Sequence, residues 1–176
     1  MAKQLFTRAL GHLAVVLALL AALAWASMAP ARAETASQAP SLRIEGSIAA
    51  AGADNHIDLS LDTLQQLAHH EIATSTAVTD GVLVFEGVLM RAVMDHVGAH
   101  GDTVTARALN GYEIDIPLRD FTDFDVLLAW SVNGKRLMPD DKGPFWIVYP
   151  RDQHEVLQDI RYDYRWVWQL DSLQVK

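Results

Sequence analysis

Apolar and polar residues alternate along several short stretches of this chain, as in β-strands that bury one face. In the N-terminal half, alternation and β-branched composition predict strands at Leu42–Gly46, Ile57–Leu59, Glu71–Thr79 and Val82–Phe85. In the C-terminal half the same signals predict strands at Val104–Leu109, Tyr112–Ile116, Val126–Val132, Phe145–Tyr149 and Trp166–Leu170.

Helical spacing of apolar residues occurs in two places. Ser60 is a good N-cap, Asp62 follows where the helix dipole favours a negative charge, and leucines then recur at helical spacing. From Gly87 the apolar positions again follow a helical repeat, and Gly98 is a natural end for this helix.

Two Asn-Gly pairs, Asn110-Gly111 and Asn133-Gly134, each separate two predicted strands, which is the strongest short signal for a hairpin. The order of elements shows no β-α-β alternation, so a parallel doubly wound sheet is excluded. We therefore expect an α+β fold, mostly β, with two or three short helices in one domain over residues 42–176.

The N-terminal residues predict export rather than part of the fold. Lys3 and Arg8 precede the apolar run Ala9–Ala26, and Ala31-Arg32-Ala33 then supplies a small-x-small cleavage motif. We expect residues 1–33 to be a cleaved signal peptide, residues 34–41 to be a flexible leader, and the protein to be periplasmic or secreted. The alternative is an uncleaved anchor, because about 18 apolar residues almost span a bilayer.

Composition narrows the classes of function. The 176 residues include no cysteine, which excludes disulfides, thiolate metal sites and a cysteine nucleophile. The formal net charge is −8, and it becomes more negative if the basic leader is removed. This charge argues against nucleic acid and against an anionic membrane surface as partners. Once the apolar leader is cleaved, we expect no stable membrane insertion. An unknown small ligand or an exported or membrane protein is the expected partner.

Two histidine pairs are candidate metal ligands with simpler explanations. His69 and His70 are expected at the end of the first helix, where adjacent side chains diverge and positive charge complements the dipole. His96 and His100 have the four-residue spacing of a helical zinc site, but Gly98 predicts that the helix ends between them.

An acidic cluster and three tryptophans also allow two interpretations. Asp120, Asp123 and Asp125 lack the glycine and distal glutamate of a calcium loop, so a loop with helix-capping aspartates is expected. Aromatic residues at alternating strand positions usually belong to a core, but they also wall apolar clefts. The three tryptophans concerned are Trp146, Trp166 and Trp168.

Several short motifs follow one another from Phe85-Glu86-Gly87-Val88-Leu89 through the two Asn-Gly turns and Gly143-Pro144-Phe145 to Arg165-Trp166-Val167-Trp168. Read in this order, they resemble one known family, the molybdopterin-binding domain of the sulfite-oxidase type. The resemblance extends over about residues 42–176. It implies a mixed α+β domain built on twisted sheets.

The resemblance also implies where a cofactor would bind and what this chain lacks. Enzymes of the family hold molybdenum through a cysteine thiolate on the segment that corresponds to Thr74–Thr79, and a hydroxyl is a poor substitute. They carry an arginine where this chain has Trp146. Near the end they carry a glycine and a Lys-Trp pair that help to hold the cofactor's phosphate, and here Arg165-Trp166 keeps the cation and the tryptophan while the glycine is absent. The residues carried over to a cofactor cleft are Thr74, Thr76, Tyr112, Trp146 and Arg165.

Three functions follow as hypotheses. The first is an exported, non-catalytic binding module that has kept the scaffold and lost the redox centre, with no metal and no catalytic residue. The alternative is a periplasmic molybdopterin-dependent oxidoreductase with an atypical metal site. A third is a structural subunit whose acidic surface docks onto a basic partner.

Overall fold

The computed structural model describes residues 39–52 and 55–176. The predicted signal peptide lies outside these residues, as does most of the predicted leader. Within the described ranges, no helix has both the length and the apolar character needed to cross a membrane. The first strand begins at Ser41, one residue earlier than expected, so Ser41 belongs to the domain and not to the leader.

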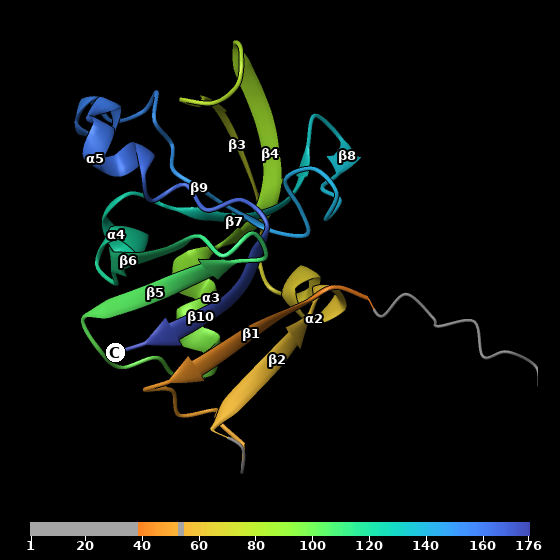
Figure 1. The fold of residues 1–176 in the computed structure, drawn as a ribbon, viewed down its shortest axis with the longest axis vertical. Helices are drawn as coiled ribbons and strands as arrows, with labels where there is room; N and C mark the ends of the chain where they lie inside the picture. The colour runs from red at the N-terminus through yellow and green to blue at the C-terminus, as the bar shows by residue number, and fades with distance from the viewer. Residues whose placement is uncertain (1–38, 53–54) are drawn as a thin grey trace, which may run out of the picture. The chain divides into compact units, whose positions relative to one another are not determined.

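The first of two sheets has five strands and contains both ends of the domain (Figure 1). Their order is β2 (His56–Ser60), β1 (Ser41–Gly46), β10 (Leu170–Val175), β5 (Thr103–Ala108) and β6 (Glu113–Pro117). β1 and β10 are parallel, whereas the other pairs are antiparallel. The last strand of the chain therefore completes the sheet that the first strand begins.

The second sheet lies above the first in Figure 1 and extends into a long hairpin. It runs from β3 (His69–Ser75) through β4 (Val82–Leu89) and β7 (Leu127–Val132) to β8 (Lys135–Arg136). A further short strand, β9 (Trp146–Val148), pairs with the first half of β7. All pairings in this sheet are antiparallel.

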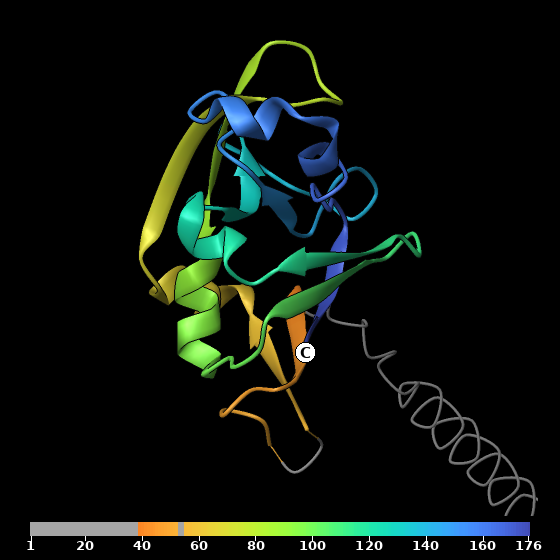
Figure 2. The same ribbon diagram turned by 90° about the vertical axis from the view of Figure 1, so that its left-hand side faces the viewer.

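Four α-helices, all short, accompany the sheets in the described residues. They are α2 (Leu61–Gln66), α3 (Met90–Val97), α4 (Asp120–Asp123) and α5 (Ile160–Asp163), with a 3₁₀ turn at Glu155–Gln158. Figure 2 shows α3 and α4 stacked along one side of the molecule. The α+β, mostly β class is confirmed, although the helices exceed the predicted two or three.

The local turn and capping predictions are confirmed. The Ser60 hydroxyl accepts a hydrogen bond of 3.1 Å from the Thr63 amide at the start of α2. Gly98 ends α3 in the left-handed conformation, and His100 lies beyond it. Asn110-Gly111 joins β5 to β6, and Asn133-Gly134 joins β7 to β8.

The helix predicted from Gly87 begins three residues later, at Met90. Residues 87–89 instead pair with β7, because β4 is an interior strand that uses both edges for ladder bonds. Gly87 is required by this pairing, since an added Cβ would lie 2.1 Å from the Leu128 carbonyl oxygen. Residues 87–89 resemble a helical repeat only because both faces of this end of β4 are buried, so apolar residues occur there without alternation.

The strand predicted at Glu71–Thr79 is shifted toward the N-terminus. α2 ends at Gln66, so His69 and His70 begin β3, and the helix-dipole explanation for them was wrong. The His69 ring packs against Trp130 with 6.0 Å between centroids. β3 ends at Ser75 because the Thr76 hydroxyl accepts the Val78 amide and closes a turn.

Two C-terminal expectations also need correction. Asp120–Asp123 forms the helix α4 rather than a loop. Residues 166–169 are not a strand, because Gln169 has a positive φ of 53° and interrupts the extended backbone before β10. The Val167 carbonyl nevertheless accepts the Ile147 amide at 2.9 Å, which places this segment beside β9.

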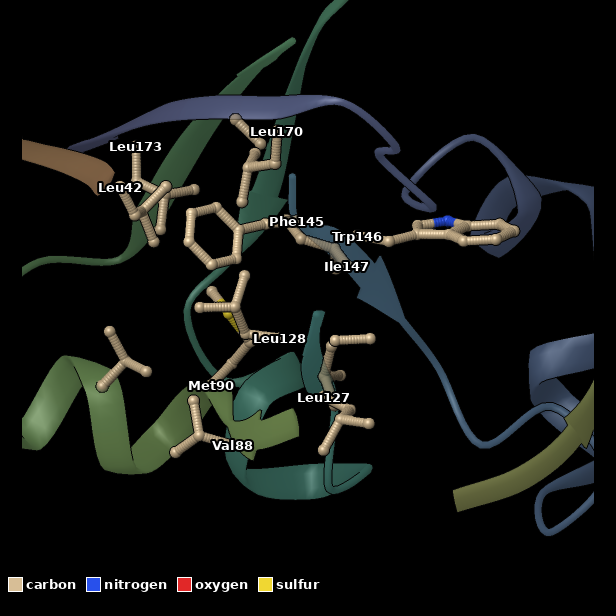
Figure 3. Packing of buried hydrophobic residues seen from close by; sticks show 14 of the residues in the cluster. Leu42, Val88, Met90, Leu127, Leu128, Phe145, Trp146, Ile147, Leu170 and Leu173 are labelled. Carbon is tan, nitrogen blue, oxygen red and sulfur yellow. The ribbon is translucent and has the colours of Figure 1, made fainter. Parts of the chain in front are cut away.

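A continuous hydrophobic core joins the two sheets. Figure 3 shows Phe145, which directly precedes β9 of the second sheet, pointing among Leu42 and Leu170 of the first sheet and Met90 of α3. The neighbouring Trp146 points to the opposite side, as successive strand residues do. Phe145 therefore locks the sheets together, while Trp146 supports a different region of the molecule.

Candidate functional site

A cavity of about 380 Å³ opens where three chain segments meet. The turn after β3 contributes Ala77 and Val78, and the tip of the β5–β6 hairpin contributes Asn110 and Tyr112. The third wall comes from α5 and the segment that follows it. Its lining residues are Ile160, Asp163, Tyr164, Trp166 and Trp168. We call this the aromatic pocket, because four of its lining residues are tyrosine or tryptophan.

Hydrogen bonds hold the walls of the aromatic pocket together. The Tyr112 hydroxyl donates to the Tyr164 carbonyl at 2.7 Å and ties the hairpin tip to the third wall. The Asn110 side chain accepts the Tyr112 amide at 2.9 Å, which fixes the turn that presents Tyr112. Partial burial raises the pKa of Tyr112, so its hydroxyl stays protonated and able to donate.

Trp146 lies behind this pocket and supports its tryptophans. Its ring meets Trp166 and Trp168 edge to face, with centroid distances of 6.3 and 6.4 Å, and meets Phe85 in the same way. The buried indole nitrogens of Trp146 and Trp166 have no hydrogen-bond partner. Unpaired buried donors carry a desolvation cost, and Trp166 lies in the pocket wall.

A buried ionic network lies under the same segment. The Arg165 guanidinium pairs with Asp120, whose other donor is the Tyr149 hydroxyl at 3.0 Å. Asp120 is 3% exposed, and Arg165 also stacks on the Tyr162 ring at 4.6 Å. Burial raises the pKa of Tyr149 well above its usual range, so this phenol donates to the carboxylate rather than ionising. The positive charge of Arg165 is thus compensated inside the protein.

The end of β3 is clamped by a loop far away in sequence. Asp152 accepts both the Ser75 amide and the Ser75 hydroxyl at 2.6 Å. The Thr74 hydroxyl donates to the Ser75 carbonyl and accepts the Asp152 amide at 3.2 Å. Both hydrogen-bonding capacities of Thr74 are therefore used within the protein.

We expect Asp152→Asn to lower the free energy of unfolding at neutral pH by about 1 kcal/mol, since the clamp is exposed to solvent. The two bonds from Ser75 lower the pKa of Asp152 below its ordinary value. The stability that the Asp152 carboxylate contributes is present above the ordinary pKa of about 4 and is lost as the pH falls through its lower pKa in the folded protein. Urea unfolding of the unchanged protein and of Asp152→Asn, at pH 7 and at pH 3, measures the difference in their free energies of unfolding. A difference that is equal at both pH values would contradict the prediction.

The structure brings only some of the predicted site residues to the aromatic pocket. Tyr112 lines it, Trp146 lies behind it, and Thr76 forms the turn that leads to its first wall. Thr74 is completely buried at the end of β3, and Arg165 is turned toward Asp120. A role for these five residues in cofactor binding stays a prediction.

Sequence reasoning missed several lining residues. Ile160, Tyr164 and Val78 are exposed apolar side chains, and nothing in their local pattern marked them as neighbours. The alternative interpretation of the tryptophans as cleft walls applies to Trp166 and Trp168. The hairpin signal at Asn110-Gly111 was the one local clue to the position of Tyr112.

A second cavity, of about 510 Å³, lies beside α3 and α4. Arg91, Asp95, Asp102 and Arg119 line it, so its charges are balanced, and Arg91 is paired with Asp125. Within the described ranges, no group of three or more histidine or acidic side chains is arranged to hold a metal ion. Neither histidine pair nor the acidic cluster forms such a group.

Comparison with known families gives one match. The family model described as oxidoreductase molybdopterin binding domain matches residues 32–153, which is more than half of the chain. The match includes Thr74, Thr76, Tyr112 and Trp146, and it ends before the third wall of the aromatic pocket. Comparison with curated proteins gives no match.

Proposed function

Because the chain belongs to the oxidoreductase molybdopterin-binding domain family, we propose that it uses the family's scaffold as an exported, non-catalytic binding module. In this proposal no molybdenum centre forms, and the aromatic pocket binds a different ligand. The observation that carries the proposal is the chemistry of the residues available to a molybdenum cofactor, which do not fit it.

The first mismatch concerns the metal. Molybdenum in this family is expected to bind a soft thiolate, and the chain has no cysteine. The corresponding segment offers threonine and serine hydroxyls. Thr74 and Ser75 already bond within the Asp152 clamp, and Thr76 bonds to Thr79 at 2.7 Å. These neutral hydroxyls are therefore both the wrong donors and already engaged.

The second mismatch concerns the cofactor's phosphate. A phosphate group needs cationic or N–H donors that are free to face it. Arg165, the residue that the resemblance assigns to this task, is paired with buried Asp120. The described lining of the aromatic pocket includes no lysine or arginine, and its one charged residue is Asp163. An anionic cofactor would thus enter a site without compensating charge.

Export rests on the N-terminal pattern of residues 1–33. A basic start, an apolar run and a small-x-small motif are typical of a signal peptide, and this supports a periplasmic or secreted location. The candidate partners are then a small ligand or the outer domain of a membrane protein. The competing function, a molybdopterin-dependent oxidoreductase with an atypical metal site, is supported by the family match alone.

The proposal predicts that the chain, expressed with its own leader in a host that makes molybdopterin, contains far less than one molybdenum and one pterin per chain. Metal analysis and pterin fluorescence of the purified protein measure both. An exported molybdenum enzyme prepared from the same host controls for cofactor supply. About one metal per chain would overturn the proposal and favour the oxidoreductase, whereas pterin without metal would indicate a cofactor carrier and equally refute it.

A further inference from the structure

We propose that the aromatic pocket binds a small organic cation whose charge lies on an alkylated ammonium group. This inference rests on the proposed function and names the class of ligand for the same site. Three features lead to it: a carboxylate with one accessible oxygen, exposed aromatic rings around that carboxylate, and a described lining that contains no lysine or arginine.

Asp163 gives the described lining its one charged group. Its Oδ1 atom is buried and lies 3.5 Å from Nε of Arg151, and neither of these two atoms has a hydrogen-bond partner. The described residues donate no hydrogen bond to its Oδ2 atom either, yet Oδ2 is not buried, and the side chain is 21% exposed. Oδ2 is therefore the oxygen that a ligand can reach, and a carboxylate oxygen calls for a cation or a donor.

Three aromatic side chains of the lining offer surface that a ligand can touch. Tyr164 is 58% exposed, Tyr112 is 39% exposed, and Trp168 is half-buried. Trp166 differs from them, because it is 5% exposed and packs against Trp146 and Tyr149, so it supports the wall from behind. The face of an aromatic ring is partly negative and attracts a cation that lies over it, and alkylated ammonium groups are bound in this way.

The charges around the pocket oppose an anion and favour a cation. Arg165 is neutralised by Asp120, and Arg151 lies outside the lining, against the buried oxygen of Asp163. An anion would therefore meet a carboxylate and ring faces without a cation to pair with. A neutral ligand would leave the accessible Asp163 oxygen without an opposite charge. The chain's net charge of −8 raises the concentration of cations near its surface.

The size and the rim of the pocket suit the alkyl groups of such a ligand. A volume of about 380 Å³ lies within the range of about 300–1,000 Å³ typical of small-molecule sites. Val78 and Ile160 add exposed apolar surface beside the Tyr164 ring. Exposed apolar residues grouped around one cavity are typical of ligand sites. The alkyl groups would cover part of this surface while the charge lies near Asp163.

Choline is a suitable probe, because two molecules of nearly the same shape differ from it in charge. In 3,3-dimethylbutan-1-ol a carbon atom replaces the charged nitrogen, and 3,3-dimethylbutanoate carries a negative charge. In ¹⁵N-labelled full chain we expect choline to bind saturably and to shift amide resonances of the pocket lining. The alcohol and the carboxylate should each bind at least about tenfold more weakly. Added salt should weaken the binding of choline and leave that of the alcohol nearly unchanged.

Variants separate the carboxylate and the rings from the rest of the molecule. Asp163→Asn should weaken choline binding about five- to tenfold and leave binding of the alcohol unchanged. Asp171→Asn, which removes the same charge from an exposed position outside the lining, should have little effect. Tyr164→Leu should weaken choline binding about threefold or more, whereas Tyr164→Phe, which keeps the ring, should not. Both Tyr164 variants keep the backbone carbonyl that accepts the Tyr112 hydroxyl, and Tyr164 is exposed, so the fold should be retained.

Each outcome either supports or refutes the inference. Equal binding of choline and the alcohol would show a merely apolar pocket, preference for 3,3-dimethylbutanoate would show an anion site, and either result refutes it. Equal effects of Asp163→Asn and Asp171→Asn would mean that choline responds only to net charge, which also refutes it. Absence of choline binding in a chain that lacks molybdenum refutes this inference alone, whereas stoichiometric molybdenum refutes the proposed function itself.

Discussion

Replacing Asp120 with alanine is expected to lower the free energy of unfolding by about 3–5 kcal/mol. Asp120 is 3% exposed and neutralises Arg165, whose side chain is 22% exposed. Without the carboxylate, a largely buried cation and the Tyr149 hydroxyl both lose their partner. Breaking a buried pair from one side has a cost of this size because the remaining charge is uncompensated. Urea unfolding followed by tryptophan fluorescence measures it.

Two comparisons test the cause of this loss. Asp123→Ala removes an exposed carboxylate from the same helix and should change stability by less than about 0.5 kcal/mol. Adding Arg165→Met to Asp120→Ala should restore part of the loss, since the unpaired cation is then gone. If the double variant is less stable than Asp120→Ala, the network does not act as a compensated pair.

Replacing Trp146 with alanine is expected to lower the free energy of unfolding by about 3–5 kcal/mol. Trp146 is 1% exposed and contacts Phe85, Trp166 and Trp168 edge to face. Its removal leaves a large cavity behind the aromatic pocket and takes away the support of both wall tryptophans. Thermal and urea unfolding measure the loss of stability.

Trp168→Ala is the matched control for this change. It removes the same atoms from a half-buried position that also contacts Trp146. The expected loss is less than half of that for Trp146→Ala, because a cavity open to solvent costs less than an enclosed one. Trp146→Phe should be intermediate in stability. Equal losses for the two alanine variants would mean that Trp146 does not anchor the cluster.

The family match covers only part of the aromatic pocket and of the buried ionic network. It covers both predicted hairpins and the segment where the thiolate would stand, but it ends at residue 153. The third wall of the aromatic pocket and the Arg165 side of the buried network lie after that point.

Local chemistry explains which elements were predictable. The Ser60 cap, the Gly98 stop and the two Asn-Gly hairpins depend on residues within one turn of each other, so the sequence indicates them directly. The extension of β4 through Leu89 was not predictable in this way. It depends on pairing with β7, about forty residues away, and that pairing overrides a helical repeat.

The burial and the hydrogen-bond partners of Asp120 could not be predicted from the sequence, although its place in an acidic run could be seen there. The sequence places Asp120 in an acidic run with two other aspartates, and nothing local distinguishes it from them. Only the packing of α4 against the chain near Tyr149 and Arg165 buries this one carboxylate and leaves Asp123 exposed. Burial is a property of contacts between distant segments, and so is the resulting compensation of charge.

By itself the sequence determined the mostly β class, the family, the turns that order the strands, and the lack of any thiolate ligand. These follow from composition and from contacts between near neighbours in the chain. The tertiary structure alone decided that Arg165 is neutralised, that Thr74 is enclosed, and that three distant segments form an aromatic pocket with an unpaired Trp166 donor. The reason is that charge compensation, burial and cavity shape depend on long-range packing, which local patterns do not encode.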